Sequence, residues 1–494
     1  MEKQSYKNVS NVDQKIIDDN VRITVPNDAS PNDSAENDSV QRTTPTINLP
    51  YLTQIESKVE EKEDTLEERE LKRKNVTVLG LSGLQNIGNT CYMNAVIQCI
   101  SSMKYFTACM INENIYEREF YSHLFSNVTQ NLADDKRKKQ KLEDDAEVTI
   151  SGHERNTKCV CSVTGQLQKL LKTMWNGNNI VVPKTFKYTL GIKNEIYRGF
   201  SQNDSQETLN FILDSIHEEC KTSAEIDGQH VDPKIKTFMG IHNNLLKAIN
   251  KNKNPEEQII QRAELDKYTM DNYWEFINYG AIKYWAKHIK LNYSLVTELL
   301  NGLFCSTVTC KQCGTKNPSF ELYNMIPVEI PQDGESTLEN CLKHFVSDEN
   351  LNTENDNQFH CEKCDCKTNA VKSMSIWNVS PIVIIQLKRF KQDGMRLTKS
   401  KFKVTFPINK LSFDDILNEH NSSRGNDYEL TGIVQHMGTL NSGHYRAYTK
   451  NSINNKWYIF DDSSVAHIPE SEIEGEMITD NAYLLFYQKI IKNN

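Results

Sequence analysis

One cysteine stands where a helix is predicted to begin. Residues 83–94 read GLQNIGNTCYMN, a turn rich in Gly and Asn that runs into apolar residues at helical spacing and places Cys91 in the first turn. Unpaired N–H groups and the macrodipole at a helix start favour the thiolate form of a cysteine. Gly88 would allow a tight turn, and Asn86 would direct an amide at a developing oxyanion. The alternative interpretation is a helix cap followed by an ordinary buried cysteine.

A histidine and an aspartate far along the chain complete a candidate catalytic set. His444 opens a predicted strand, and Asp461 directly follows the predicted strand Trp457–Phe460. A hairpin joining these strands would set Asp461 beside His444, which is the nucleophile–base–orienter arrangement of Cys–His–Asp catalysis. Asp462 is the rival for the orienting role. Because side chains alternate along a strand, we expect only one of these carboxylates to reach His444.

Two C-x-x-C pairs form a second candidate site, with Cys310 and Cys313 in the first pair and Cys361 and Cys364 in the second. Each pair can form a tight knuckle, and two knuckles supply four thiolates to a tetrahedral Zn²⁺. The long spacing predicts that the ligands join two hairpins at the end of an extended sheet. Cys366 is an alternative to Cys364 as the fourth ligand, and free thiols are the alternative to a metal site.

The elements that must position these residues are predicted to be helical first and β-rich later. Helical spacing of apolar residues predicts helices over Cys91–Ile100 and Ser205–His217. From about Phe304 onward, short β-rich runs lie between turn signals. The clearest of these runs are Pro381–Phe390, Glu429–Gln435, Tyr445–Thr449, Trp457–Phe460 and Tyr483–Tyr487. Helices followed by strands predict an α+β fold with the two kinds of element segregated.

Composition narrows the classes of protein that the chain can represent. Of its 494 residues, positions 1–75 hold 11 basic and 16 acidic side chains, and this polar stretch is predicted to be a disordered acidic tail. Charged stretches at 133–155 and 222–267 are predicted insertions, the second with some helix. The net charge of −9 argues against a nucleic-acid partner, including a zinc-dependent nucleic-acid module.

The cysteines and the pattern of apolar residues predict the cellular compartment of the protein. The 13 cysteines are an odd number, and the N-terminus shows no secretion signal, so a disulfide framework is not expected. No uncharged apolar run approaches the roughly 18 residues of a membrane span. We therefore expect an intracellular protein of the cytoplasm or nucleus that has no membrane partner.

The sequence resembles the ubiquitin-specific proteases, the papain-like cysteine proteases that remove ubiquitin. The segment GLQNIGNTCYMNAVIQC is similar to the Cys box of that family, and GTLNSGHYRAYTKN, WYIFDDSSV and AYLLFYQK are similar to its His box. The resemblance spans about residues 80–488. It implies a catalytic domain over 76–490, with a helical thumb at about 80–300, zinc-binding fingers at about 300–375 and a β-rich palm at about 376–488.

The resemblance also implies a role for each candidate residue. Cys91 would be the nucleophile, His444 the general base and Asp461 the residue that orients the imidazole. Asn86 resembles the oxyanion-hole residue of the family, and Asp462 would support it. The implied reaction is hydrolysis of the isopeptide or peptide bond after the C-terminal Gly-Gly of ubiquitin, through a Cys91 thioester. Ubiquitin and ubiquitinated proteins would be the partners, and the zinc ion would be structural.

A third family segment is only partly present. The family commonly has Gln-Gln-Asp-x-x-Glu-Phe, whereas residues 202–208 read QNDSQET. Asp204 and Glu207 match and are implied to contact the ubiquitin tail, whereas Asn203 and Thr208 depart from the pattern. Asp204 as a helix N-cap and nothing more is the alternative. The altered segment also leaves two other functions open: a catalytically weak or silent ubiquitin-binding scaffold, and a protease for another ubiquitin-like modifier.

Overall fold

The computed structural model describes residues 78–111, 162–224, 226, 231–331, 334–393, 396–418, 421, 423–439 and 442–491. The predicted acidic tail at 1–75 and the predicted insertion at 133–155 lie outside these residues. Contacts divide the described residues into two units, one within 225–279 and the other formed by the rest. The larger unit carries every candidate site residue named from the sequence.

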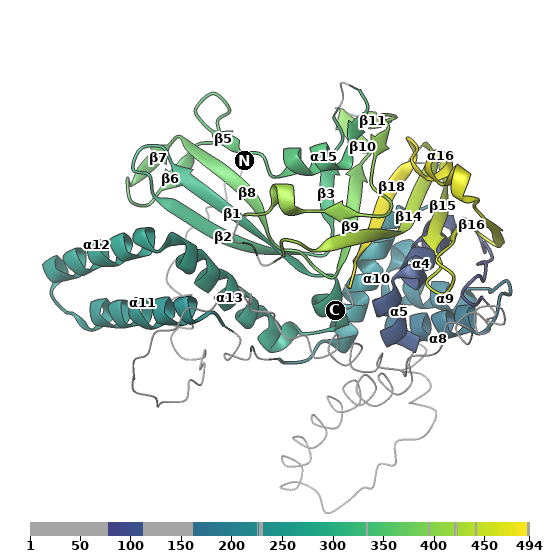
Figure 1. Ribbon diagram of the computed structural model, residues 1–494, viewed down its shortest axis with the longest axis horizontal. Helices are drawn as coiled ribbons and strands as arrows, with labels where there is room; N and C mark the ends of the chain where they lie inside the picture. The colour runs from purple at the N-terminus through teal and green to yellow at the C-terminus, as the bar shows by residue number, and fades with distance from the viewer. Residues whose placement is uncertain are drawn as a thin grey trace, which may run out of the picture. The chain divides into compact units, whose positions relative to one another are not determined.

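The predicted order of helices and then strands is confirmed, with the early helices in purple and teal and the later strands in green and yellow (Figure 1). The early helices of the larger unit are α4 (Cys91–Ser102), α5 (Lys104–Ile111), α8 (Val163–Trp175), α9 (Lys184–Lys193), α10 (Ser205–Cys220) and α14 (Leu295–Leu299). The helices α4 and α10 include the two predicted ones and continue slightly beyond their predicted ends.

The helix α4 lies at the centre of the larger unit. Every one of its residues is buried, the polar ones included, because it packs against α10 as well as against the strands β14 and β15. The Gln98 amide donates a hydrogen bond to the carbonyl of Ser82, at 2.8 Å. A helix that is covered on every side is fixed more firmly than a surface helix. The packing of α4 therefore fixes the position of Cys91 at its start.

An eight-stranded sheet receives α4. Its order is β17–β16–β15–β14–β18–β9–β3, with β13 pairing at β14. The strands are β3 (Ile326–Glu329), β9 (Ile382–Lys388), β13 (Leu411–Ser412), β14 (Asp427–Thr439), β15 (Ser442–Lys450), β16 (Trp457–Asp461), β17 (Ser464–His467) and β18 (Ala482–Lys489). All five predicted strands are present in this sheet. Neighbouring strands are antiparallel except for β3 and β9, which are parallel.

A second sheet of four strands has the order β2–β1–β8–β5. Its strands are β1 (Gly302–Cys310), β2 (Lys316–Tyr323), β5 (Glu349–Leu351) and β8 (Ala370–Asn378), and a separate hairpin pairs β6 (Phe359–Cys361) with β7 (Cys366–Thr368). The remaining short elements are β4 (Ser336–Thr337), α15 (Leu338–Phe345), β10 (Phe390–Asp393), β11 (Arg396–Lys399), β12 (Val404–Thr405) and α16 (Ile473–Met477).

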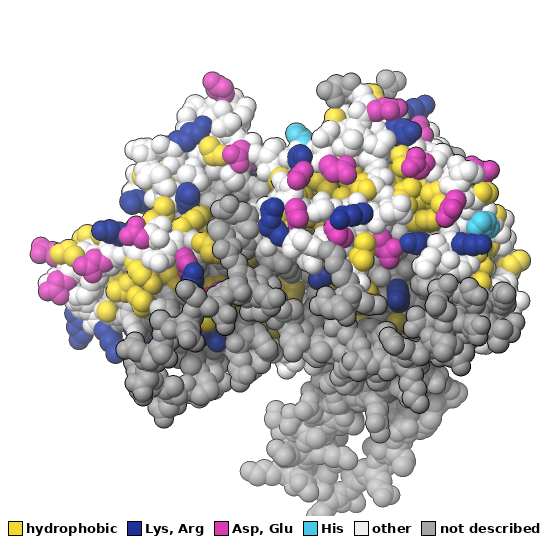
Figure 2. All heavy atoms as spheres, viewed as in Figure 1, with side chains coloured by type: hydrophobic (Ala, Val, Ile, Leu, Met, Phe, Trp, Pro, Cys, Tyr) yellow, Lys and Arg dark blue, Asp and Glu magenta, His cyan; other side chains and the backbone are white. Residues whose placement is uncertain are grey.

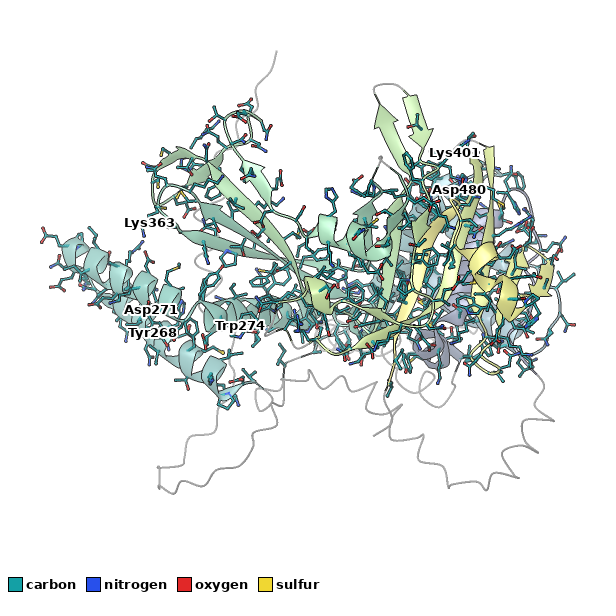
Figure 3. The ribbon with its side chains drawn as sticks, turned by 45° about the horizontal axis from the view of Figure 1, so that its top comes forward. Tyr268, Asp271, Trp274, Lys363, Lys401 and Asp480 are labelled. Carbon is teal, nitrogen blue, oxygen red and sulfur yellow. The ribbon has the colours of Figure 1, made fainter. Side chains whose placement is uncertain are left out.

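The smaller unit is helical. It contains α11 (Pro233–Lys251), α12 (Pro255–Asp271) and the first residues of α13 (Tyr273–Asn292). Phe238 stacks on Tyr268 with ring centroids 5.3 Å apart. Figure 3 labels Tyr268, which belongs to α12. Tyr279 donates a hydrogen bond from its hydroxyl to Asn243, at 3.0 Å. The insertion predicted at 222–267 is therefore a helical unit, and it continues to residue 279.

Two observations concern the nucleic-acid-binding and membrane-spanning classes of protein. Acidic and basic side chains are interspersed over the described surface that Figure 2 shows. Within the described ranges, no helix has the length and apolar character needed to cross a bilayer.

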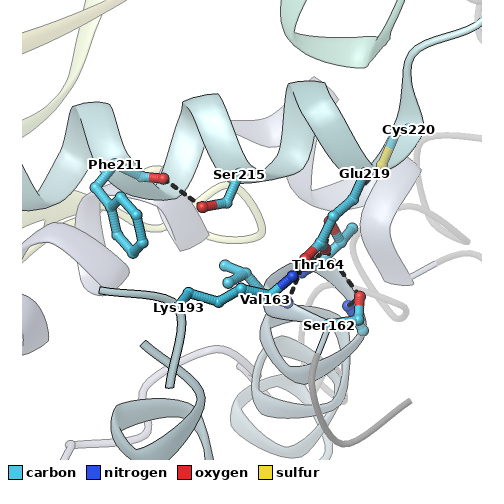
Figure 4. A network of polar contacts seen from close by, with 9 residues as sticks. Ser162, Val163, Thr164, Lys193, Phe211, Ser215, Glu219 and Cys220 are labelled. Atoms are coloured by element: carbon cyan, nitrogen blue, oxygen red, sulfur yellow. Dashed lines mark hydrogen bonds and ion pairs between the residues drawn. The ribbon is translucent and has the colours of Figure 1, made fainter. Parts of the chain in front are cut away.

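A carboxylate on α10 caps the neighbouring helix α8 (Figure 4). Glu219 accepts hydrogen bonds from the Ser162 hydroxyl at 2.8 Å, from the Val163 N–H at 3.0 Å and from both the N–H and the hydroxyl of Thr164. The first N–H groups of a helix have no partner within the helix, and a carboxylate there also interacts favourably with the macrodipole. Burial raises the pKa of Glu219, but these hydrogen bonds outweigh it and hold the pKa below its usual value.

Removal of this cap should destabilise the larger unit. We expect Glu219→Ala to lower the free energy of unfolding by about 2–3 kcal/mol, because several buried donors lose their acceptor. The matched control is Glu218→Ala, which removes an exposed ion pair with Lys221 and should cost less than about 1 kcal/mol. Urea unfolding monitored by circular dichroism measures both changes.

The pH dependence of the Glu219 contribution has a definite sign. The pKa is lower in the folded state, so the contribution is complete above the unfolded pKa and is lost as pH falls through the folded pKa. Equal losses of stability in the Glu219 and Glu218 variants at pH 7 would contradict the capping role.

Candidate active site

The turn before α4 is folded around the side chain of Asn86. Gly88 and Asn89 have left-handed backbones, with φ of 116° and 53°. The residue before the helix, Thr90, makes no capping bond with its own side chain. Instead, Asn86 Oδ1 accepts from the N–H groups of Gly88 and Thr90, at 3.0 and 3.1 Å. Buried Cys91 is thus the first residue of α4, as predicted.

Asp462 joins this turn to the strands that carry the histidine. Its carboxylate accepts from the side-chain amides of Asn86 at 2.9 Å and Asn94 at 2.8 Å, and its carbonyl accepts from the Leu84 N–H at 2.8 Å. The expectation that only one of the two carboxylates reaches His444 agrees with the hydrogen bonds, because Asp461 bonds the imidazole whereas Asp462 bonds the two amides. Ligand atoms of Asp462 and His444 nevertheless lie within 4.8 Å of each other. Asp462 has a φ of 50°, a left-handed conformation that ends the alternation.

His444 and Asp461 form the predicted pair on β15 and β16. His444 Nε2 donates to Asp461 Oδ1 at 2.6 Å, and the same imidazole interacts with the Cys91 thiol strongly enough to shift its pKa. The interaction with Cys91, with help from Asp461, outweighs burial and raises the pKa of His444 to about 9. The structure therefore connects Cys91, His444 and Asp461 in the order that nucleophile, base and orienting residue require.

Sequence reasoning missed the part that Gln202 plays. Its side-chain amide donates to the carbonyl of Gly443 at 2.9 Å and accepts from the Gly443 N–H at 3.0 Å, so it pairs with the backbone next to His444. A side chain at position 443 would not fit, because a Cβ there would lie 2.1 Å from His436 Nε2. The Gln at the start of the family segment was the available signal.

A buried polar group behind the nucleophile was also missed. The Tyr92 hydroxyl accepts from Lys187 Nζ at 3.2 Å and from the Asn203 amide at 3.0 Å. Burial lowers the pKa of Lys187. Asn203, one of the departures from the family pattern, is therefore placed against the residue that follows Cys91.

The two residues predicted to bind substrate have different surroundings. Asp204 caps α10 by accepting from the Gln206 N–H at 2.7 Å, and its carboxylate also accepts from the Tyr483 hydroxyl at 3.0 Å. Burial raises the pKa of Asp204. The capping contact that was the alternative interpretation is thus present, whereas Glu207 is exposed. Contact of either residue with a substrate stays a prediction.

The predicted thiol cluster comes together at the ends of hairpins. Its four sulfur atoms lie within 4.8 Å of one another and belong to Cys310, Cys313, Cys361 and Cys364. The Cys313 and Cys361 sulfurs are 3.6 Å apart, whereas tetrahedral Zn²⁺ with bonds of about 2.3 Å would place them about 3.8 Å apart. Exposed Cys366 lies outside this cluster, and its sulfur is 3.9 Å from the Gln312 side chain. The donor set therefore fits a zinc ion.

A thiol at a helix start, together with an imidazole bonded to a carboxylate, is the arrangement that cysteine proteases use. Comparison with known proteins gives the family. The sequence profile described as ubiquitin carboxyl-terminal hydrolase matches residues 82–487, and the chain belongs to that family. The predicted enzyme class, that of the thiol-dependent deubiquitinases, is therefore confirmed by family.

Relatives and solved structures agree with this assignment. A probable ubiquitin carboxyl-terminal hydrolase of Acanthamoeba polyphaga mimivirus is 25% identical over 432 residues, which cover 83% of this chain and 90% of the viral protein. Ubiquitin carboxyl-terminal hydrolase 2 of Homo sapiens is 26% identical over 413 residues, covering 83% of this chain and 55% of the human protein. The chain thus spans nearly all of the viral relative but about half of the human one.

The fold is shared with a protein of known structure. The SAGA Ubp8/Sgf11/Sus1/Sgf73 DUB module bound to ubiquitin aldehyde contains a chain that matches with a TM-score of 0.52 and 20% identity. The match covers 90% of this chain and 77% of that one. The predicted α+β ubiquitin-specific protease fold is confirmed.

The raised pKa of His444 predicts the pH profile of the enzyme. We expect kcat/KM to fall above about pH 9, because the imidazolium loses its proton there. Asp461→Asn should move this alkaline limb down by about one pH unit, since a nearby opposite charge shifts a pKa by about 1–3 units. Assays on a ubiquitin–fluorophore conjugate across roughly pH 6–10.5, a span that brackets these values, measure the alkaline limb of kcat/KM in the wild-type protein and in Asp461→Asn.

A control separates this effect from a general change in charge. Asp415→Asn removes an exposed carboxylate that pairs with Lys343, and it should leave the limb in place. An alkaline limb that stays at the wild-type pH in Asp461→Asn would refute the coupling of Asp461 to His444.

Proposed function

We propose that this protein hydrolyses the isopeptide or peptide bond after the C-terminal Gly-Gly of ubiquitin on ubiquitinated proteins. The observation that carries the proposal is the placement of Cys91, at the start of α4, with the hydrogen-bonded pair of His444 and Asp461. Membership of the ubiquitin carboxyl-terminal hydrolase family supports ubiquitin as the substrate. So does the matching solved structure, in which the Ubp8 module is bound to ubiquitin aldehyde.

Each residue has a step in the proposed reaction. The Cys91 thiolate attacks the carbonyl carbon of the last glycine, and His444 gives its proton to the leaving amine as the thioester forms. His444 then takes a proton from water, which attacks the thioester and releases ubiquitin. Asp461 keeps the imidazole oriented through both steps.

The oxyanion that forms in each step needs hydrogen-bond donors. A side-chain amide has two N–H donors, and Asp462 accepts one from Asn86 at 2.9 Å. The second N–H is proposed to donate to the oxyanion, together with backbone N–H groups at the start of α4. Because Asp462 and the 86–90 turn fix the Asn86 side chain from both ends, this donor needs little reorganisation during the reaction.

The alternative functions have less support. A catalytically silent scaffold is not favoured, because the nucleophile, base and orienting residue are all present and bonded. The departures at Asn203 and Thr208 leave the segment intact, since Asn203 bonds Tyr92 and the Thr208 hydroxyl donates to the Asp204 carbonyl at 2.8 Å. A protease for another ubiquitin-like modifier is an outcome that the first experiment distinguishes.

We also propose that the thiol cluster holds one structural zinc ion in a fingers region at about 300–375, beside a helical thumb at about 80–300 and a palm at about 376–488. These regions would form one catalytic domain over 76–490, with 1–75 as its tail. A reactive thiol and four metal-binding thiols need a reducing compartment, which supports a location in the cytoplasm or nucleus.

Ubiquitin with a C-terminal electrophile tests recognition and nucleophile together. We expect it to form a covalent adduct with the wild-type protein and none with Cys91→Ser, because the hydroxyl lacks the nucleophilicity of a thiolate. The matched control is Cys366→Ser, which removes an exposed thiol and should form the adduct normally. Mass spectrometry of the intact protein measures both.

Three outcomes would count against the proposal. The first is an adduct on Cys91→Ser. The second is a wild-type protein that reacts only with the same electrophile on another ubiquitin-like modifier. The third is a folded wild-type protein that binds ubiquitin without reacting with either reagent.

The zinc proposal is tested by a pair of neighbouring cysteines. Cys364→Ser should lose about one zinc ion per chain and a large part of the folding stability, since binding of a structural metal is coupled to folding. Cys366→Ser should keep both. Inductively coupled plasma mass spectrometry and thermal unfolding measure the difference. A metal-free wild-type protein of equal stability, or zinc loss in Cys366→Ser alone, would refute the assignment.

A further inference from the structure

Arg446 lies two residues beyond His444 on β15, so both side chains belong to the same face of the strand. The antiparallel register pairs Ala447 with Phe460. Continuing that register by one step sets Arg446 opposite Asp461 and leaves His444 diagonal to it. Directly opposite residues are the closest cross-strand neighbours. The strand pairing therefore brings Arg446, as well as His444, to the Asp461 carboxylate.

The carboxylate divides its two oxygens between these neighbours. Asp461 Oδ1 lies 2.6 Å from His444 Nε2, and Oδ2 lies 2.7 Å from Arg446 Nε. The contact with Arg446 is an ion pair of opposite charges, and Arg446 Nε has no hydrogen-bond partner among the described residues. Both side chains are about one-third exposed, at 36% for Arg446 and 32% for Asp461, so the pair is partly screened by solvent.

We propose that Arg446 is a positioning residue for catalysis, which holds Asp461 with one oxygen toward His444 and limits the negative charge that His444 experiences. This inference rests on the proposed function, in which Asp461 orients the catalytic imidazole. In this role Arg446 acts through Asp461 and not on the reacting atoms.

Two physical effects follow from the ion pair. A carboxylate held at both oxygens has lost its freedom to rotate, so the His444 ring keeps the tautomer and direction that proton transfer needs. A guanidinium beside the carboxylate also offsets part of its charge, and the imidazolium is stabilised less than it would be by Asp461 alone. Loss of Arg446 should therefore loosen the geometry and stabilise the protonated imidazole at the same time.

The charged groups around the Arg446–Asp461 pair are the same in the wild-type protein and in every variant at position 446. Titratable and charged groups around this pair are Cys91 of α4, His436 of β14, Tyr448 of β15, Asp461 and Asp462 of β16, and Glu476 of α16. A change in the pH profile of a position-446 variant thus reports the guanidinium and not a different set of neighbours.

The test compares Arg446→Gln with wild type on a ubiquitin–fluorophore conjugate. We expect the alkaline limb of kcat/KM to move up by about 0.5–1 pH unit, less than the 1–3 units of an unscreened pair. We expect kcat to fall about 3- to 30-fold with KM nearly unchanged, a part of the roughly 10²–10⁴ that general-base catalysis supplies. Arg446→Lys keeps the charge without the planar fork, so its limb should stay at the wild-type pH while kcat recovers only in part.

The matched control is on the same strand. Lys450→Gln removes a similarly buried ion pair, that of Lys450 with Glu429 at 2.8 Å. Lys450 is the last residue of β15 and is not paired with Asp461. It should change neither the limb nor kcat. Because Lys is a conservative replacement, Arg446→Lys also keeps the comparison available if Arg446→Gln does not fold, which circular dichroism reports.

A second readout needs no ubiquitin. Iodoacetamide alkylates thiolates, and mass spectrometry of the Cys91 peptide measures the rate at Cys91. This rate rises first as the thiolate forms, and it rises a second time at higher pH, where the neighbouring imidazolium loses its proton. That second rise should lie at higher pH in Arg446→Gln than in wild type. A wild-type protein inert toward ubiquitin would defeat the proposed function but leave this shift measurable. An unshifted alkylation profile in folded Arg446→Gln would overturn the role of Arg446. So would an Arg446→Lys variant that loses activity and whose alkaline limb of kcat/KM moves away from the wild-type pH.

Discussion

The candidate active site depends on one junction, the hydrogen bonds from Asn86 and Asn94 to Asp462, which lies 376 and 368 positions further along the sequence. One segment carries Cys91, the proposed nucleophile, and the other carries His444, the proposed base, so the two are brought together only when the junction forms. The two backbones also meet closely, because a Cβ at Gly83 would lie 2.4 Å from the carbonyl oxygen of Ser463. Catalytic geometry is in this sense a property of the folded domain and not of either motif.

The parts that sequence predicted correctly are those with a local signal. A turn of Gly and Asn before apolar residues at helical spacing gave the start of α4, and β-rich runs between turn signals gave β15 and β16. The hairpin then placed Asp461 beside His444, because the chain between the two strands is short. The cysteine knuckles were predictable for the same reason, since each pair is set by its own tight turn.

The parts that sequence did not predict are set by contacts between distant segments. Alternation along β16 predicted that only one of Asp461 and Asp462 reaches His444, but it gave no sign that Asp462 would bond Asn86 and Asn94. The pairing of Gln202 with the backbone of Gly443 joins residues 241 positions apart, and no local pattern contains it. The capping of α8 by Glu219 is likewise invisible in either helix alone. Propensity and periodicity describe elements, whereas these contacts depend on how elements meet.

Two adjacent carboxylates show how surroundings divide chemical work. Asp462 is bonded to two neutral amides, which leaves its charge in place to hold the turn and to orient Asn86. Asp461 lies between an imidazole and a guanidinium, so its charge is shared between a group that must gain and lose a proton and one that cannot. Similar groups with different partners acquire different roles. The backbone turn between β16 and β17 creates that difference, because it sends consecutive side chains to different neighbours.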